Sequence, residues 1–100
     1  MASGIYAQSD LTATTLTTVF TIAALGTYNI RLTNRNASSV TIRLALAATS
    51  TPSASEYIEY DAVIPANGVL EEQGIPLQVG KLIVAYSSVA NVSVSVWGIE

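Results

Sequence analysis

The chain contains no cysteine and no histidine. Without cysteine there can be no disulfide bond, thiolate nucleophile or zinc–thiolate site. Without histidine the commonest general base and metal ligand are also missing, so Cys–His and Ser–His nucleophile pairs are excluded. We therefore expect a protein that is not an enzyme, with no catalytic residues, no cofactor-binding residues and no metal ligands.

Charge is also scarce, because charged residues make up 11 % of the chain against about a quarter in an average soluble domain. Four basic and seven acidic residues give a formal net charge of −3. Too few basic residues are present to neutralise a phosphate backbone, so we expect no nucleic-acid partner. A surface this neutral is typical of one that protein contacts cover, and we expect a homo-oligomer.

The few charges are unevenly placed. Residues 1–50 carry a net charge of +2, and residues 51–100 carry −5. Two interpretations are open: the halves interleave in one domain and neutralise each other, or they meet head to tail between subunits. The first is favoured, because it needs no second chain.

Long apolar runs are absent as well, since threonine, serine, asparagine or arginine interrupts each one. No segment reaches the ~18 apolar residues of a membrane-spanning helix, so we expect no membrane partner. Residues 1–6 show no basic region followed by an apolar one, and we expect no cleaved secretion signal. At 100 residues the chain fits a single domain over residues 1–100, with residues 1–16 as an arm or first strand and residues 17–100 as the body.

What the sequence does contain is strand signal. Apolar and polar residues alternate over 18–22, 28–33, 40–46, 56–61 and 92–97, residues 81–87 are almost continuously apolar, and turn residues lie between these segments. This pattern predicts an all-β fold, a single antiparallel β-sandwich of seven to eight strands with immunoglobulin-like or jelly-roll topology.

Short connections suggest how these strands pair. Residues 23–26 predict a hairpin between 18–22 and 28–33, which residues 40–46 extend to a three-stranded meander. Residues 88–91 predict a second hairpin between the last two strands. The small, polar residues 48–55, broken by Pro52, are expected to cross from one sheet to the other. The alternation predicts a core made of Phe20, Ile22, Tyr28, Ile30, Leu32, Ile42, Leu44, Leu46, Leu82, Val84, Val92, Val94 and Val96.

Polar residues that could carry chemistry are few. Lys81 could activate Ser87 or Ser88, which are near it in sequence. A lone lysine at the start of a strand is far more often a solvated charge at a sheet edge, and that interpretation is favoured.

The carboxylates Glu56, Glu59 and Asp61 could bind a hard cation such as calcium. In a regular strand, Glu59 and Asp61 share a face and Glu56 points the other way. A charge-protected sheet edge is the favoured interpretation, and cation binding is left open. The neighbours Glu71 and Glu72 are expected on opposite faces, so they cannot act as one pair.

Tyr57, Tyr60 and Trp97 are the large amphipathic side chains that protein interfaces favour, and they could also stack on sugar rings. The alternative places one tyrosine in the core and Trp97 over the end of a sheet. Asn36 and Asn91 match the glycosylation acceptor pattern, but they are interpreted as turn residues.

A series of segments follows in order along residues 17–99: Asn34-Arg35-Asn36, Val40-Thr41-Ile42-Arg43-Leu44-Ala45-Leu46, Tyr57-Ile58-Glu59-Tyr60-Asp61, Ile64-Pro65-Ala66-Asn67-Gly68-Val69-Leu70, Gly80-Lys81-Leu82-Ile83-Val84-Ala85-Tyr86 and Asn91-Val92-Ser93-Val94-Ser95-Val96-Trp97-Gly98. This series resembles a small β-sandwich module of tailed-phage virion proteins, such as structural proteins of phages of marine cyanobacteria. The resemblance implies a virion structural protein, and it transfers no active-site residue. Such modules occur in capsid decoration, neck, tail and fibre proteins alike.

The leading hypothesis is therefore a non-enzymatic virion protein, assembled in the host cytoplasm, that forms a homo-oligomer, with a trimer favoured, and attaches to other phage capsid or tail proteins. Sheet edges and the arm of residues 2–16 are expected to join subunits by surface burial and strand pairing. The alternative is a receptor- or glycan-binding module in which Tyr57, Tyr60 or Trp97 stacks on a sugar.

Overall fold

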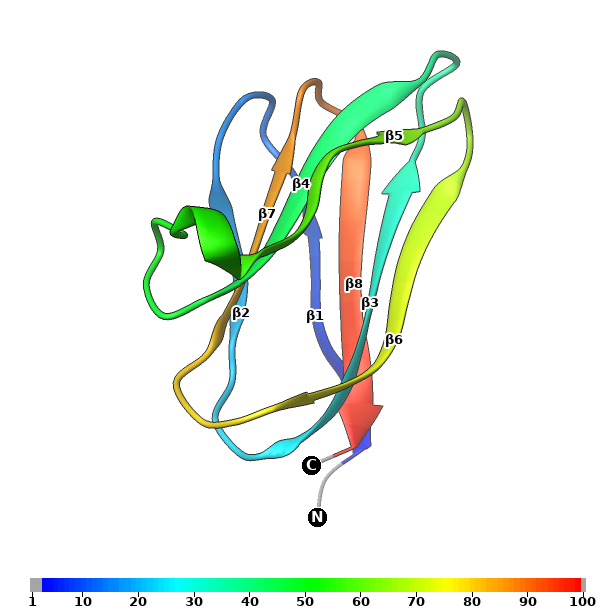
Figure 1. Cartoon of the computed structure of the whole chain (residues 1–100). Coiled ribbons are helices and arrows are strands. Elements are labelled where there is room, and N and C mark those ends of the chain that lie inside the picture. The colour runs from blue at the N-terminus through cyan, green and yellow to red at the C-terminus, as the bar shows by residue number, and fades with distance from the viewer. Residues whose placement is uncertain (1–2, 100) are drawn as a thin grey trace.

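The computed structural model describes residues 3–99, which form a β-sandwich of two antiparallel sheets (Figure 1). The eight strands are β1 (Ser3–Asp10), β2 (Thr17–Thr21), β3 (Gly26–Asn34), β4 (Val40–Ala47), β5 (Tyr57–Ile64), β6 (Val69–Leu77), β7 (Leu82–Ser87) and β8 (Val92–Ile99). One short 3-10 helix, η1 (Ala54–Glu56), precedes β5. The predicted all-β sandwich of seven to eight strands is confirmed. No helix within residues 3–99 is long and apolar enough to cross a membrane.

The order of the strands identifies the topology. Sheet A has the order β1-β8-β3-β6 and sheet B the order β2-β7-β4-β5. The chain changes sheet at every connection between described strands except the one from β4 to β5. This winding is that of a jelly roll, which decides between the two predicted topologies.

The predicted local pairings are therefore wrong. β2 and β3 lie in different sheets, as do β3 and β4, and β7 and β8, so neither hairpin nor the meander forms. The loop of residues 48–55, which was expected to change sheets, instead joins the neighbours β4 and β5 within sheet B. Alternation of apolar residues defines which face a strand buries, but it does not define the neighbouring strand.

The core between the sheets contains most of the predicted residues. Ile22, Tyr28, Ile30, Leu32, Ile42, Leu44, Val92, Val94 and Val96 are buried there, and Phe20 and Leu46 pack against it half-buried. The prediction fails on β7, where Ile83 and Ala85 face this core. Leu82 and Val84 lie instead on the outer face of sheet B, in a small cluster with Ala45, Ala47 and Tyr57. β7 is apolar on both faces, so its register could not be determined from alternation.

The four edge strands share an irregularity that the inner strand pairs lack. Each edge pairing, of β1 with β8, β2 with β7, β6 with β3 and β5 with β4, contains a shift of register. The inner pairings of β3 with β8 and of β4 with β7 run without interruption. Edge strands interrupted by bulges are poor templates for the addition of another strand.

The N-terminal segment belongs to the sandwich. Ser3–Asp10 pairs with β8 as the first strand, which was one of the two predicted alternatives. Leu11 is buried in the core, and its backbone N–H donates to the carbonyl oxygen of Val92. Residues 1 and 2 of the predicted arm lie outside the described residues.

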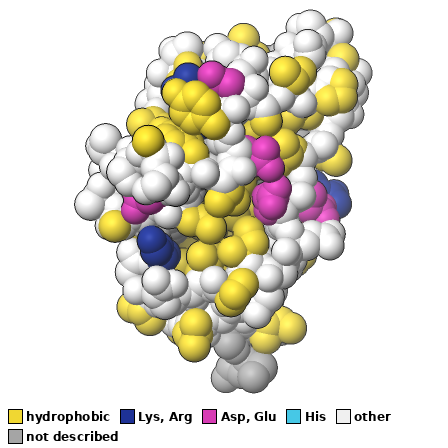
Figure 2. Space-filling view, viewed as in Figure 1, with side chains coloured by type: hydrophobic (Ala, Val, Ile, Leu, Met, Phe, Trp, Pro, Cys, Tyr) yellow, Lys and Arg dark blue, Asp and Glu magenta, His cyan; other side chains and the backbone are white. Residues whose placement is uncertain are grey.

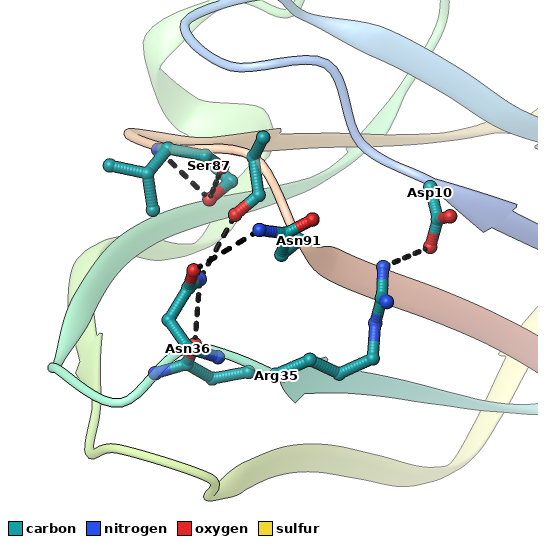
Figure 3. A network of polar contacts seen from close by, with 8 residues as sticks. Asp10, Arg35, Asn36, Ser87 and Asn91 are labelled. Carbon is teal, nitrogen blue, oxygen red and sulfur yellow. Dashed lines mark hydrogen bonds and ion pairs between the residues drawn. The ribbon is translucent and has the colours of Figure 1, made fainter.

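Asparagine side chains tie together the loops at one end of the sandwich. The buried Asn34 amide donates to the carbonyl oxygens of Ser38, Ile64 and Pro65, and its side-chain oxygen accepts from Asn36. Asn36 and Asn91 face each other across two loops (Figure 3). Both are turn residues, as predicted. The Asn36 amide already donates to Asn34 and to the Ala90 carbonyl oxygen.

Candidate functional site

The three carboxylates considered for cation binding point to three different places. Glu56 lies in η1, where its carboxylate accepts hydrogen bonds from the backbone N–H groups of Ser53 (2.8 Å) and Ala48 (3.0 Å). These bonds hold the pKa of Glu56 below its usual value, and the charge of Lys81 adds to the effect. Glu56 therefore closes the loop between β4 and β5.

Glu59 faces the opposite way, toward the space between the sheets. Glu59 is on edge strand β5, where it pairs with the core residue Leu44 of β4. Glu72 is on edge strand β6, where it pairs with the core residue Ile30 of β3. The two carboxyl groups meet across the side of the sandwich where β5 and β6 do not pair, and they lie within hydrogen-bonding reach. The hydrogen bond with Glu59, together with burial and the charge of Glu59, raises the pKa of Glu72. The neighbouring carboxyl group of Glu59 therefore favours the protonated form of Glu72.

Figure 2 shows this open side from the front, with hydrophobic side chains in its middle and acidic side chains beside them. Acidic groups at inward-facing positions of unpaired strands oppose the approach of another sheet edge. Glu71, the neighbour of Glu72, points outward to Arg31, which confirms that the two glutamates occupy opposite faces.

Asp61 takes a third direction because β5 is bulged there. Its backbone has a φ of 52°, and the pairing of β5 with β4 shifts register between Ile42 and Leu44. Asp61 thereby reaches Arg43 on the outer face of sheet B, so the prediction that Glu59 and Asp61 share a face is wrong. Within residues 3–99 no three acidic side chains gather closely enough to hold a metal ion.

Arg43 is the centre of a group of side chains that we call the tyrosine–arginine patch: Arg43, Tyr57, Tyr60, Asp61 and Tyr86. The Arg43 guanidinium lies over the Tyr60 ring, 4.3 Å from its centroid, and over the Tyr86 ring at 5.0 Å. Its Nε donates to Asp61 Oδ1 at 2.7 Å, and this bond raises the pKa of Arg43. Tyr57 meets Tyr60 edge to face, with ring centroids 5.1 Å apart.

One part of the patch packs against the sheet, and another part is exposed to solvent. Tyr57 is half-buried over the outer cluster of sheet B, whereas 59 % of Tyr60 is exposed to solvent. Val63, farther along β5, is 64 % exposed, and Ile58 is 39 % exposed. Neither tyrosine lies in the core between the sheets, so the alternative that placed one there is wrong.

Arg43 and Tyr86 were missed as members of a site at the sequence level. They lie opposite each other in the pairing of β4 with β7, which are more than 30 residues apart in the chain. The prediction of Leu82 and Val84 as core residues implies, by alternation, that Tyr86 faces inward as well. Alternation around Leu44 does predict Arg43 outward, so a correct register for β7 would have joined the two.

Three ion pairs among residues 3–99 show how the opposite charges of the two halves are arranged. Arg31 pairs with Glu71 at 2.5 Å and Arg43 with Asp61 at 2.7 Å, so both pairs join the first half to the second. The third pair, Arg35 with Asp10, lies within the first half. This pairing supports the interpretation that the halves interleave and neutralise each other.

The remaining candidates lie apart from the patch. Ser87 is buried and its hydroxyl donates to the Val89 carbonyl oxygen. The charge of Lys81 acts on Glu56 of η1. Trp97 lies half-buried on the outer face of sheet A, and Arg31 covers its ring at 5.8 Å from the centroid. Neither known family models nor curated proteins match this chain.

Proposed function

We propose that this chain is a non-enzymatic structural protein of a phage virion, which acts by associating with copies of itself and with other virion proteins. The observation that carries the proposal is the tyrosine–arginine patch. Tyrosine and arginine are, with tryptophan, the residue types most enriched among the residues that contribute most binding energy at protein interfaces. Here the exposed Tyr60 ring is already held in place by its contact with Arg43, so little side-chain freedom is lost when a partner covers it.

The fold and the sequence resemblance support the same function. Jelly rolls build viral capsid domains, although they also build lectins and cupins, so the fold alone does not select a function. The resemblance of residues 17–99 to tailed-phage virion modules favours the first of these. Capsid decoration, neck, tail and fibre positions are all consistent with it.

The structure favours association through a face over association through an edge. Every described edge strand is interrupted by a register shift, and β1 is already paired with β8 in its own chain. Subunits are therefore joined less by the strand pairing that the sequence suggested than by side chains buried on the outer face of sheet B. The expected assembly is a closed ring, with a trimer favoured.

The oligomeric state of the full chain tests this proposal. Light scattering coupled to size-exclusion chromatography is measured at several concentrations for the wild type, Tyr60→Ser and Leu25→Ser. Leu25 is a matched control, because it is 68 % exposed and lies in the connection between β2 and β3, away from the patch. Loss of a hot-spot tyrosine costs about 2 kcal/mol, so Tyr60→Ser should weaken each contact between subunits by about 30-fold and move dissociation to higher protein concentrations.

Two outcomes contradict the proposal. A wild-type chain that stays monomeric at high micromolar concentration refutes self-association in solution. If Tyr60→Ser and Leu25→Ser behave alike, the patch is not the interface. The virion assignment is tested separately by antibody labelling of purified, intact particles in the electron microscope, and particles that carry no label refute it.

A further inference from the structure

A shallow polar depression lies on the outer face of sheet A, in the layer opposite the tyrosine–arginine patch. It has a volume of about 350 Å³ and is lined by Gln8, Ser9, Asp10, Ser93, Val94 and Ser95. Its floor is β8, which lies between β1 and β3. Ser93 and Ser95 occupy the outward positions of β8, and the longer Gln8 and Arg31 lie opposite Ser95 on either side. Small side chains between longer ones produce a trough along β8.

Larger groups mark the two ends of this trough. Arg35, just after β3, reaches Asp10 at the end of β1 with an Nη2–Oδ1 distance of 2.7 Å, so the pair bridges β8 (Figure 3). Trp97 lies on the same outward row of β8, two residues beyond Ser95, and carries the Arg31 guanidinium over its ring. From Ser93 to Trp97 the strand extends for about 13 Å, which is longer than one sugar ring.

The polar groups of the trough are free to bind. The hydroxyls of Ser93 and Ser95 and the amide of Gln8 form no hydrogen bond with any residue in the described part of the chain. The backbone of β8, by contrast, pairs with β1 on one side and β3 on the other. A ligand on this face is therefore recognised by side chains alone.

The charges around the trough cancel. Asp10 is paired with Arg35, and Arg31 is paired with Glu71. A phosphate or nucleic-acid ligand needs a net positive site, and a peptide strand needs a free sheet edge, so neither matches this face. Uncharged donors and acceptors beside an aromatic ring match a ligand with many hydroxyls and an apolar C–H face.

We propose that the trough along β8 binds a neutral oligosaccharide. Ser93, Ser95 and Gln8 exchange hydrogen bonds with hydroxyls of the sugar rings, while the apolar face of one ring packs against the Arg31–Trp97 pair at the end of the trough. This site goes beyond the proposed structural function, because it uses the other sheet and a different class of ligand. Its failure would leave the self-association experiment unaffected.

Titration of the full chain by two-dimensional NMR tests the site. The neutral probes are maltohexaose, cellohexaose, laminarihexaose and mannohexaose, and a galacturonic acid oligomer is the charged probe. We expect at least one neutral probe to shift backbone amide signals of β1, β3 and β8. Ser95→Leu fills the trough from an outward position and should weaken binding at least tenfold.

Further variants separate recognition from folding. Trp97→Phe keeps an aromatic face and should retain part of the affinity that Trp97→Ala loses, whereas Tyr60→Ser on the other sheet should bind as the wild type does. If Trp97→Ala does not fold, Ser95→Leu still decides the matter. The proposal is overturned if no neutral probe causes shifts at millimolar concentration, if the charged probe binds in preference, or if Ser95→Leu binds as tightly as the wild type.

Discussion

Gly98 marks a close approach of two backbones in sheet A. It lies on the inner strand β8, directly opposite Tyr28 of β3. A methyl group added at Gly98 would lie 2.1 Å from the Thr27 carbonyl oxygen and 3.0 Å from the Tyr28 Cα. Both contacts are to backbone atoms, so no side-chain rotation relieves them. To reach an ordinary contact of 3.4 Å, the two strands would have to move apart by about 1.3 Å.

The substitution Gly98→Ala should therefore be strongly destabilising. The strand that would move carries the fully buried Tyr28, whose ring packs against those of Tyr6 and Phe20 and whose hydroxyl donates to the Ala24 carbonyl oxygen at 2.8 Å. Overpacking a core costs about 1–3 kcal/mol, and a clash with backbone belongs at the upper end of that range. For a domain of this size, about 3 kcal/mol lowers the melting temperature by about 12–24 °C.

Thermal unfolding followed by circular dichroism measures this effect. Wild type and Gly98→Ala are compared at one protein concentration, because the melting temperature of an oligomer depends on concentration. Ser95→Ala is the matched control, since it lies on the outer face of the same strand and should change the stability by less than about 0.5 kcal/mol. If Gly98→Ala has the same melting temperature as Ser95→Ala, the close approach of β3 and β8 does not exclude a side chain at position 98.

Four more predictions concern stability. Leu44 is fully buried, and Leu44→Ala should cost about 2–5 kcal/mol in urea unfolding, whereas an unchanged midpoint would place it outside the core. The pKa of Glu72 is raised, so the stability that this group contributes to the folded chain is present below its pKa in the unfolded chain and is lost as pH rises through its pKa in the folded chain. Glu72→Gln should therefore stabilise the chain at pH 7 and not at pH 3. The pKa of Glu71 is lowered through Gln73 and Arg31, so its contribution is lost as pH falls, and Glu71→Gln should destabilise at pH 7. Equal pH profiles of the two variants would contradict this assignment. Removal of residues 1–16 deletes β1 and Leu11 from the core, and it should unfold the chain; a folded, soluble remainder would contradict it.

Strand positions and most of the core could be predicted because they depend on local alternation. Residues 28–33 and 40–46 fall inside β3 and β4, and the inward rows around Ile30 and Ile42 are buried as expected. The large apolar residues of each strand lie on one face, and β4 buries only the small Ala45 and Ala47 on its other face, so a single period-two pattern determines both the existence and the orientation of the strand. β7 breaks this rule, because its outer face is also covered.

The partners of the strands could not be predicted, since a jelly roll pairs segments far apart in the chain. Arg43 meets Tyr86 only through the pairing of β4 with β7, and Glu59 meets Glu72 only because β5 and β6 are the edges of different sheets. The bulge at Asp61 is also invisible in the alternation, although it directs that carboxylate to Arg43. The candidate site was thus predicted in part: Tyr57 and Tyr60 were recognised, but not Arg43, which lies over the Tyr60 and Tyr86 rings.

The two proposed contact regions lie on opposite outer faces, and this arrangement has a functional consequence. The tyrosine–arginine patch belongs to sheet B, and the trough along β8 belongs to sheet A. A sandwich separates such faces by both sheets and the core between them, so a protein partner that covers Tyr60 does not cover Ser95. Attachment to a virion through sheet B would therefore leave the trough directed away from the attachment surface. An oligomer formed through the patch would also present one trough per subunit, and several weak sugar contacts would then combine into a stronger one.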